Sequence, residues 1–380
     1  MNLNKRVDYF RNILVTIFVV GVLNFNLLAQ TPSASDTLDI PRLEKEIGQM
    51  LMVGIRGTHL NADAMQQTRQ QITDGEIGGI IFFKHNIKNS RQFRIFVKSI
   101  QSITLNIPLL LAVDEEGGKV RRLRKSQGFV EFPSAAHVGA NLDQAKAYDI
   151  YTDMATQISK TGLNLNLGPV VDVNINRASP AIGQLNRSFS RNPGTVYDFS
   201  ATFIKAHHDM GILTTLKHYP GHGSSREDTH NNLTDITHTW RTSEQLPFKR
   251  LIDSSQVDLI MAGHLFDTNI DPQYPASLST AHIQHGLREK LGFDGVVVTD
   301  DLQMGAIMKN YKLDDIIISA VNAGCDILQF SDPLDLKQNL PIYVREVIIS
   351  GIRDGQIDPE NIHASYQRIT ALKQKLIPGK

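Results

Sequence analysis

The chain is poor in cysteine: its 380 residues include a single one, Cys325, so no disulfide can form within the chain. A protein of this length buries enough apolar surface to fold without disulfides, so this scarcity does not argue against export to an oxidising compartment. Cys325 lies in the apolar segment CDILQF with no activating partner beside it. We therefore interpret it as a small core residue rather than a nucleophile.

An excess of charge of either sign is missing as well, because 39 basic residues balance 39 acidic ones. Such a chain has no net field that would attract a polyanion. Nucleic acid and anionic membrane surfaces are therefore not expected partners. The hydrophobic fraction of 41% is that of an ordinary globular domain, so the chain has the material for a large core.

The first residues differ from the rest of the chain. Basic residues at positions 5, 6 and 11 precede an apolar run over 13–29, and the polar segment QTPSAS follows. This pattern predicts a secretory signal peptide over 1–29, cleaved after Ala29, with a flexible leader over 30–40 and a periplasmic or secreted product. An uncleaved membrane anchor is the alternative, and Asn24 and Asn26 disfavour it because they interrupt the apolar run. No cysteine lies near the exit, which excludes a lipidated cysteine anchor.

Over 41–380, short apolar segments alternate with longer amphipathic ones. Each short segment is bounded by Gly, Pro or polar residues, and most are rich in Val, Ile or Leu, as buried parallel strands are. The segments 143–162 and 192–211 are typical of helices that end at glycine. The eight predicted strand segments are 51–55, 79–83, 109–114, 163–173, 214–220, 259–264, 295–300 and 326–331.

Eight strands that alternate with helices predict an α/β fold, a single (β/α)8 TIM barrel over 41–380. A doubly wound open sheet is the competing architecture. A glycine-rich phosphate-binding fingerprint after the first strand would favour that sheet, and the sequence has none there. The barrel is therefore the preferred interpretation.

Polar residues gather where the apolar segments end. In a barrel these ends converge on one face, where active sites lie. One polar residue at a strand end can merely cap a helix, but several on successive strands predict a shared pocket. These residues are Asp114, Asp172, Lys217, His218, His264 and Asp300.

The segment LKHYPGHGSSREDTH, over 216–230, carries the densest group of reactive side chains. Glycine and proline force a turn after His218, and the loop that follows presents Asp228 and His230. A carboxylate two residues before a histidine can hold its ring and raise its basicity, which suits a general acid and base. The residues alone leave two other interpretations open: a solvated polar loop, and a metal site formed by His218, His222 and His230.

Six motifs then occur in one chain, and their combination is very specific. They are VDEEGGKVRRL (113–123), GQLNRSFS (183–190), KHYPGHG with DTH (217–230), MAGH (261–264), PASLS (275–279) and VVVTDDLQMGAI (296–307). On these motifs the chain resembles glycoside hydrolase family 3, in its β-N-acetylglucosaminidase branch, from Ile47 to its end. The resemblance implies a TIM barrel without a second catalytic domain.

The resemblance also implies the chemistry of the site. It identifies Asp300 as a nucleophile that forms a glycosyl-enzyme, as in a retaining glycosidase, and Asp228 with His230 as the acid/base pair. A histidine acid/base adds no negative charge beside the nucleophile when it gives up its proton, and it titrates near neutral pH. Asp301 is the neighbouring carboxylate, and strand parity in the sequence does not by itself choose between it and Asp300.

Five residues are implied to bind the sugar, with no metal and no organic cofactor. Either of the two arginines among them can instead form a structural ion pair. Glu115 and Lys119 depart from the family pattern, because many members carry Gln and Arg there. The implied sugar-binding residues are Asp114, Arg122, Arg187, Lys217 and His218.

The expected activity is exo-hydrolysis of terminal β-linked N-acetylglucosamine from peptidoglycan fragments, as in cell-wall recycling, or from chitooligosaccharides. The single tryptophan, Trp240, favours a short pocket, because extended polysaccharide clefts usually display several aromatic platforms. Alternatives within the family are a phosphorylase and a β-glucosidase. Outside it they are a metal-dependent hydrolase and an inactive cell-wall-binding barrel, and the presence of Asp300, Asp228 and His230 disfavours the inactive barrel.

Overall fold

Eight parallel strands form the centre of the computed structural model, which describes residues 38–61, 65–103, 105–229, 233–332 and 339–377. Their order in the sheet, β11-β9-β7-β6-β3-β2-β1-β12, follows the order of the chain. A parallel bridge between Val298 and Ile327 joins β11 to the start of β12 and closes the barrel. The strands are β1 (Leu51–Gly54), β2 (Gly79–Phe82), β3 (Leu110–Val113), β6 (Leu165–Asn166), β7 (Leu213–Tyr219), β9 (Leu259–Ala262), β11 (Val296–Thr299) and β12 (Leu328–Phe330).

Each of the eight predicted strand segments overlaps one of these strands, so the predicted barrel is confirmed. The fourth segment, 163–173, differs most from its prediction, because regular pairing covers only Leu165–Asn166. Gly168 and Pro169 follow, and proline has no N–H to donate to the ladder. Beyond them Val170 makes a single bridge to Lys217, which still aligns this segment with β7.

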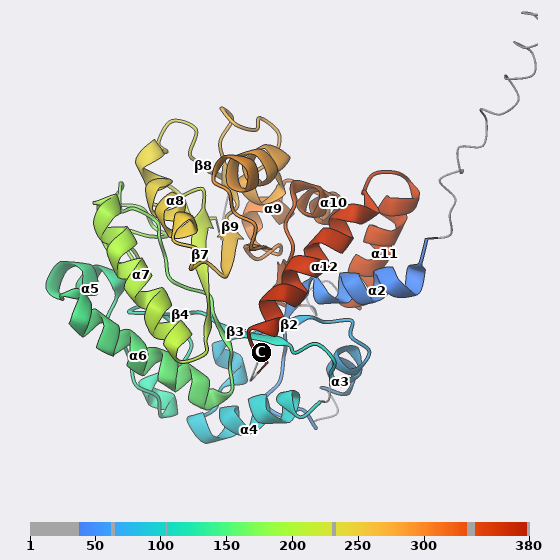
Figure 1. Cartoon of the computed structure of the whole chain (residues 1–380), viewed down its shortest axis with the longest axis horizontal. Coiled ribbons are helices and arrows are strands. Elements are labelled where there is room, and N and C mark those ends of the chain that lie inside the picture. The colour runs from blue at the N-terminus through green and yellow to red at the C-terminus, as the bar shows by residue number, and fades with distance from the viewer. Residues whose placement is uncertain (1–37, 62–64, 104, 230–232, 333–338, 378–380) are drawn as a thin grey trace, which may run out of the picture. The chain divides into compact units, whose positions relative to one another are not determined.

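Helices follow the strands along the chain and surround the barrel (Figure 1). The helix α4 buries an apolar stripe of Phe93, Phe96, Val97 and Ile100, and the side chain of Asn89 caps its first turn. The helices are α2 (Ile40–Gln49), α3 (Gln66–Thr73), α4 (Ser90–Gln101), α5 (Ala135–Asn141), α6 (Gln144–Thr161), α7 (Pro193–Asp209), α8 (Leu246–Asp253), α9 (Gly305–Met308), α10 (Leu313–Ala323), α11 (Leu340–Arg353) and α12 (Pro359–Gln374), with a π-helical turn η6 (Ala281–Lys290) between β9 and β11.

The two helices that the sequence predicts are α6 and α7. Asp143 caps α6 through its side chain, and Gly162 ends it with a φ of 89°, a left-handed conformation that favours glycine. Asn192 caps α7, whose first residue is Pro193. Capping residues that satisfy the free N–H groups thus fix both starts where the sequence places them.

The predicted signal peptide over 1–29 and most of the predicted leader lie outside the described residues. The helix α2 begins at Ile40, the last residue of that predicted leader. Among the residues that the structure describes, no helix combines the length and apolarity needed to cross a membrane.

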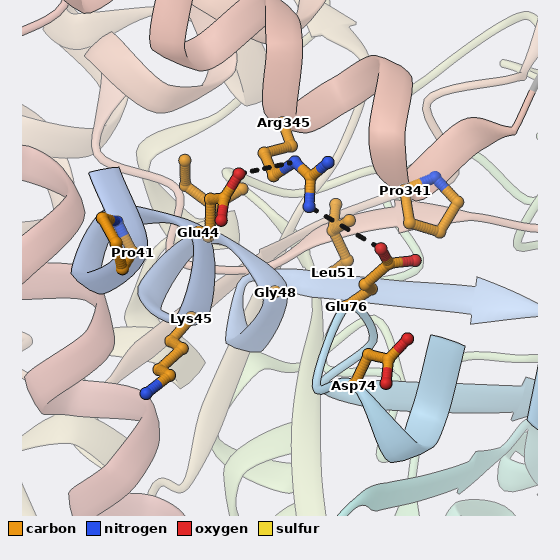
Figure 2. A pocket seen from close by; sticks show the side chains of 10 residues that line it. Pro41, Glu44, Lys45, Gly48, Leu51, Asp74, Glu76, Pro341 and Arg345 are labelled. Carbon is orange, nitrogen blue, oxygen red and sulfur yellow. Dashed lines mark ion pairs between the residues drawn. The ribbon is translucent and has the colours of Figure 1, made fainter. Parts of the chain in front are cut away.

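A shallow cavity of about 260 Å³ lies beside the start of β1, between α2 and α11. Figure 2 shows Arg345 between the carboxylates of Glu44 and Glu76, each 3.6 Å from it. Partial burial raises the pKa of Glu76, and the charge of Arg345 opposes that shift. These charges compensate one another, as expected at the amino-terminal face of a barrel, where residues act on stability.

Candidate active site

A pocket of about 390 Å³ lies at the carboxyl-terminal ends of the strands. Most of the barrel strands and the segments that follow them contribute to it, so residues far apart in the sequence share one cavity, as the strand-end pattern predicted. Its charged and polar lining residues are Asp114, Glu116, Arg122, Arg187, Lys217, His218, Asp228, Asp300, Asp301, Gln329 and Ser331.

The register of the barrel explains why these side chains reach the pocket. Ile81 pairs with Ala112, and Thr215 pairs with Leu259, so alternate residues on each strand share the inner face. Continuing that alternation along β3 leads to Asp114. On β7 the register shifts between Leu216 and Tyr219, which adds one residue relative to β9. A bulge of this kind re-aims side chains, and here two consecutive residues, Lys217 and His218, line the pocket.

Asp114 is held by two cations. Its Oδ1 lies 2.8 Å from Lys217 Nζ, and its Oδ2 lies 2.8 Å from Arg122 Nη2. Burial opposes ionisation, but the charges of Lys217 and Arg122 outweigh it and hold the pKa of this carboxyl well below its usual range. Asp114 is therefore a fixed anion whose remaining lone pairs can accept hydrogen bonds from a ligand.

Glu116 forms the second anionic centre. Arg187 binds it in bidentate fashion at 2.8 Å for both contacts, and Lys217 Nζ lies 2.7 Å from its Oε1. Burial opposes ionisation, but Arg187 and Lys217 lower the pKa of Glu116 to about 2. Lys217 thus bridges two carboxylates and keeps its proton, since they raise its pKa against the effect of burial.

His218 is fixed from both sides of its ring. Its Nδ1 lies 2.8 Å from Asp172 Oδ2, and its Nε2 lies 3.3 Å from Arg187 Nη2. Because arginine only donates, the network assigns the Nδ1–H tautomer, with Nε2 as an acceptor. Both ring nitrogens therefore have protein partners, and Asp172 sets the orientation of the ring.

Asp300 follows β11, and its N–H continues the ladder to Ala262 of β9. Asp300 lies two residues after Val298, so in an extended chain the two side chains point to the same face. Val298 forms a bridge with Ile327 at the start of the β12 segment. Asp301 lines the same pocket, but its Oδ1 accepts from the backbone N–H groups of Gln303 and Ser331 at 3.1 and 3.0 Å. The carboxylate of Asp301 therefore ties two loops together, and burial raises its pKa. The assignment of Asp300 as the nucleophile stays a prediction.

The loop after β7 brings Asp228 to the pocket, whereas the predicted acid/base His230 lies outside the described residues. Thr229, between them, is buried and accepts a hydrogen bond from the N–H of Ala306 at 3.2 Å. Ala306 lies in α9, which follows the segment that carries Asp300. The loop is therefore docked against the segment of the predicted nucleophile.

Buried polar groups support the base of this loop. His222 Nδ1 contacts Ser225 Oγ at 2.7 Å, and its N–H donates to Asp172 at 2.7 Å. Burial and the nearby His218 lower the pKa of His222 to about 4, so its ring is neutral. Glu244 accepts from the N–H of Ser224 at 3.0 Å, and burial raises its pKa to about 7.

The described residues do not support the interpretation of the three histidines as a metal site. Among the described residues no group of three or more His, Cys, Asp or Glu side chains is arranged to hold a metal ion. The Nδ1 atoms of His218 and His222 each form a hydrogen bond within the protein, and His230 lies outside the described residues.

The structure thus brings together seven of the eight residues that the resemblance singled out. Sequence reasoning missed Glu116, which neutralises Arg187 and Lys217, and it named Asp172 without its role toward His218. The signal for Glu116 was present: it has the same parity as Asp114. Gln329 was missed too, because it lies inside an apolar segment, DILQFS.

Comparison with known proteins agrees with this geometry. Residues 42–372 match the glycosyl hydrolase family 3 N-terminal domain. A β-hexosaminidase of Tolumonas auensis is 35% identical over 285 residues, which cover 73% of this chain and 81% of that protein. A β-hexosaminidase of Pseudomonas aeruginosa is 36% identical, over 73% of this chain and 80% of that protein.

Solved structures show the same likeness. A family 3 β-N-acetylglucosaminidase from a Paenibacillus species superposes with a TM-score of 0.80 at 32% identity, covering 88% of this chain. This chain spans 62% of that protein's length. A β-N-acetylhexosaminidase from Beutenbergia cavernae gives a TM-score of 0.77 at 29% identity, over 87% of this chain and 98% of its own.

An eight-stranded barrel with a charged pocket at its carboxyl-terminal face has its candidate active site where α/β-barrel enzymes have theirs. The chain belongs to glycosyl hydrolase family 3 and is a glycoside hydrolase.

Proposed function

We propose that the chain is a retaining exo-β-N-acetylhexosaminidase that removes terminal β-N-acetylglucosamine. The main support is that Asp300 and Asp228, from separate strand-end loops, line the same pocket. The Asp114–Lys217–Glu116–Arg187 network lines it as well. The β-hexosaminidase relatives support the choice of sugar.

Asp300 attacks the anomeric carbon and forms the glycosyl-enzyme. Its place one residue beyond β11 is set by the backbone bond to Ala262, so the carboxylate sits on a rigid strand end rather than on a free loop. Asp301 holds the loop that follows it through backbone contacts. Asp300 is fixed as well, because its Oδ1 accepts the backbone N–H of Asp301 at 2.8 Å.

Asp228 and His230 serve as the acid/base pair. The histidine protonates the leaving oxygen in the first step and activates water in the second, and Asp228 orients and polarises its ring. The contact between Thr229 and Ala306 supports this proposal, because it docks the loop against the nucleophile segment. A rigid relation between the two groups is what the two-step reaction requires.

The sugar is bound by the fixed anion Asp114 and by the cations around it. A carboxylate held ionised by Lys217 and Arg122 accepts hydrogen bonds from hydroxyls without changing its charge. Such contacts strengthen as charge develops on the ring, so they act on the transition state. Muropeptides and chitooligosaccharides are the proposed sources of this terminal sugar, and export through the segment 1–29 would place the enzyme beside them.

Turnover of a panel of aryl glycosides by the purified enzyme tests the proposal. We expect rapid release of the aryl group from the N-acetylglucosaminide and little from the glucoside, with free sugar as the product in phosphate buffer and full activity after chelation of metals. Preferred turnover of the glucoside, sugar 1-phosphate as the product, or loss of activity on chelation would each contradict it in favour of a named alternative.

A further inference from the structure

Gln329 is a buried amide among the residues that line the pocket. It lies in β12, is 4% exposed and lines the cavity that holds Asp300. Its flanking residues Leu328 and Phe330 are fully buried in the apolar core. A polar side chain at this position needs a physical reason, because burying an unpaired amide is unfavourable.

The backbone of Gln329 is fully used, but its side chain is not. Its N–H donates to Thr299 Oγ1 at 3.1 Å, and its carbonyl accepts from the N–H of Leu302 at 2.9 Å. Its Oε1 is buried without a partner. Within the described part of the chain no hydrogen bond of its Nε2 is found either.

The missing hydrogen-bond partner distinguishes Gln329 from most other residues of the pocket. Of the described lining residues, only Arg122 and Gln329 carry a buried side-chain atom without a partner. Arg122 is already accounted for, because its Nη2 binds Asp114. Gln329 is therefore the one residue of the described lining that has a buried side-chain atom without a partner and no hydrogen bond from the rest of that side chain.

Gln329 lines the pocket beside two apolar side chains of the barrel strands. Together with Ile81 of β2 and Met261 of β9 it comes from the second, sixth and eighth barrel strands, which contribute to one inward layer. Of these three side chains, only that of Gln329 is polar. A pyranose resting on this layer meets two hydrophobic side chains and one amide, which offers both a donor and an acceptor.

We propose that Gln329 is a specificity-determining residue that hydrogen-bonds one polar substituent of the terminal sugar. This inference rests on the proposed function. The bound sugar completes the hydrogen bonds that the fold leaves open, so the enzyme discriminates against sugars that lack the substituent. In the free enzyme the amide lowers stability, as functional groups often do.

The variant Gln329→Leu separates these effects, since leucine fills the space and removes the amide. We expect kcat/KM for aryl N-acetylglucosaminide to fall roughly tenfold. We expect the melting temperature to rise by about 2 °C, because the unpaired group is gone. A residue with a structural role would lower the melting temperature instead.

A panel of aryl N-acetylglucosaminides lacking one hydroxyl each, together with the aryl glucoside, identifies the substituent. For the analogue that lacks the contacted group, wild type and Gln329→Leu should have equal kcat/KM, whereas for the others they should differ tenfold. The control Met261→Leu changes the packing of the same layer without an amide, so any loss should be shared by all analogues.

Equal rates of wild type and Gln329→Leu on every substrate, or a uniform loss over the whole panel, overturn the inference and leave the proposed function intact. A wild-type enzyme that turns over none of these glycosides overturns the proposed function, and the inference with it.

Discussion

The two ends of the barrel both bury charge, but they arrange it differently. At the amino-terminal end Asp326 is completely buried, with Arg288 and the N–H of Val297 on one oxygen and Ser365 and Arg368 on the other. At the carboxyl-terminal end, Asp114 and Glu116 form ion pairs with neighbouring cations, and both line a cavity. The first arrangement is complete without a ligand, and the second is not.

The same contrast holds for the lysines. Lys373 is buried near the start of β2, where it donates to Gln49 Oε1 and to the carbonyl of Gly78 at 2.7 Å each, and burial lowers its pKa to about 7. Lys217 is equally buried, but two carboxylates keep it charged. The difference teaches that burial alone does not identify a functional group. A group that is kept charged and faces an open cavity is the better indicator of function.

The largest expected effect is at Asp300. Asp300→Ala should lower kcat for aryl N-acetylglucosaminide by several orders of magnitude while leaving the melting temperature near that of wild type, because a covalent nucleophile is lost from a pocket wall. Steady-state kinetics with thermal unfolding checks both. Asp301→Ala is the matched control, and labelling of Asp301 by a fluorosugar trap would show that the other carboxylate is the nucleophile.

The second expected effect is at His230, which sharpens the assignment of the loop. His230→Ala should slow glycosides with poor leaving groups about 10²- to 10⁴-fold and activated ones far less, because a good leaving group needs no proton. The glycosyl-enzyme should accumulate, and azide should restore turnover as a glycosyl azide. Mass spectrometry and product analysis test this. Asp228→Ala should show a milder form, and equal losses for all leaving groups would make His230 a binding residue.

A pair of substitutions tests the comparison of the two ends directly. Asp326→Asn removes the charge from a complete network and should lower the free energy of unfolding by about 3–5 kcal/mol, with kcat/KM per folded molecule unchanged. Glu116→Gln should destabilise as well, but it should also lower kcat/KM on the order of 10²-fold, since Arg187 and Lys217 lose their anchor. Urea unfolding and kinetics under native conditions separate the two. An active-site loss in Asp326→Asn would break the comparison.

The smallest expected effect concerns Glu115, whose pKa burial raises to about 8 against two backbone hydrogen bonds. An acid whose pKa is raised on folding contributes stability that is present below its ordinary pKa of about 4.5 and is lost as the pH rises through about 8. Glu115→Gln keeps the oxygen acceptor for the N–H groups of Arg122 and Leu123 and removes this titration. The free energy of unfolding of wild type should therefore fall as the pH rises from about 4.5 to about 8, whereas that of Glu115→Gln should fall less over this range. Parallel pH profiles of the two proteins would contradict the shift.

Local patterns in the sequence were enough to predict the barrel and most of the pocket. Short apolar segments bounded by breakers indicate buried strands because backbone pairing and burial are decided within a few residues. The capping residues Asp143 and Asn192 fixed the helix starts in the same local way. The parallel barrel brings every strand end to one face, so the sequence alone was enough to group Asp114, Lys217 and Asp300 in one pocket.

Tertiary structure alone decided what those groups do to one another. Which side chains meet across the barrel depends on the register of several strands, so the sequence could not place Glu116 beside Arg187 or give Lys217 two carboxylates. The tautomer of His218 follows from Asp172 and Arg187, which are distant in the chain. The open amide of Gln329 is invisible in an apolar segment, because a hydrogen bond that is missing can be recognised only when all the neighbours are known.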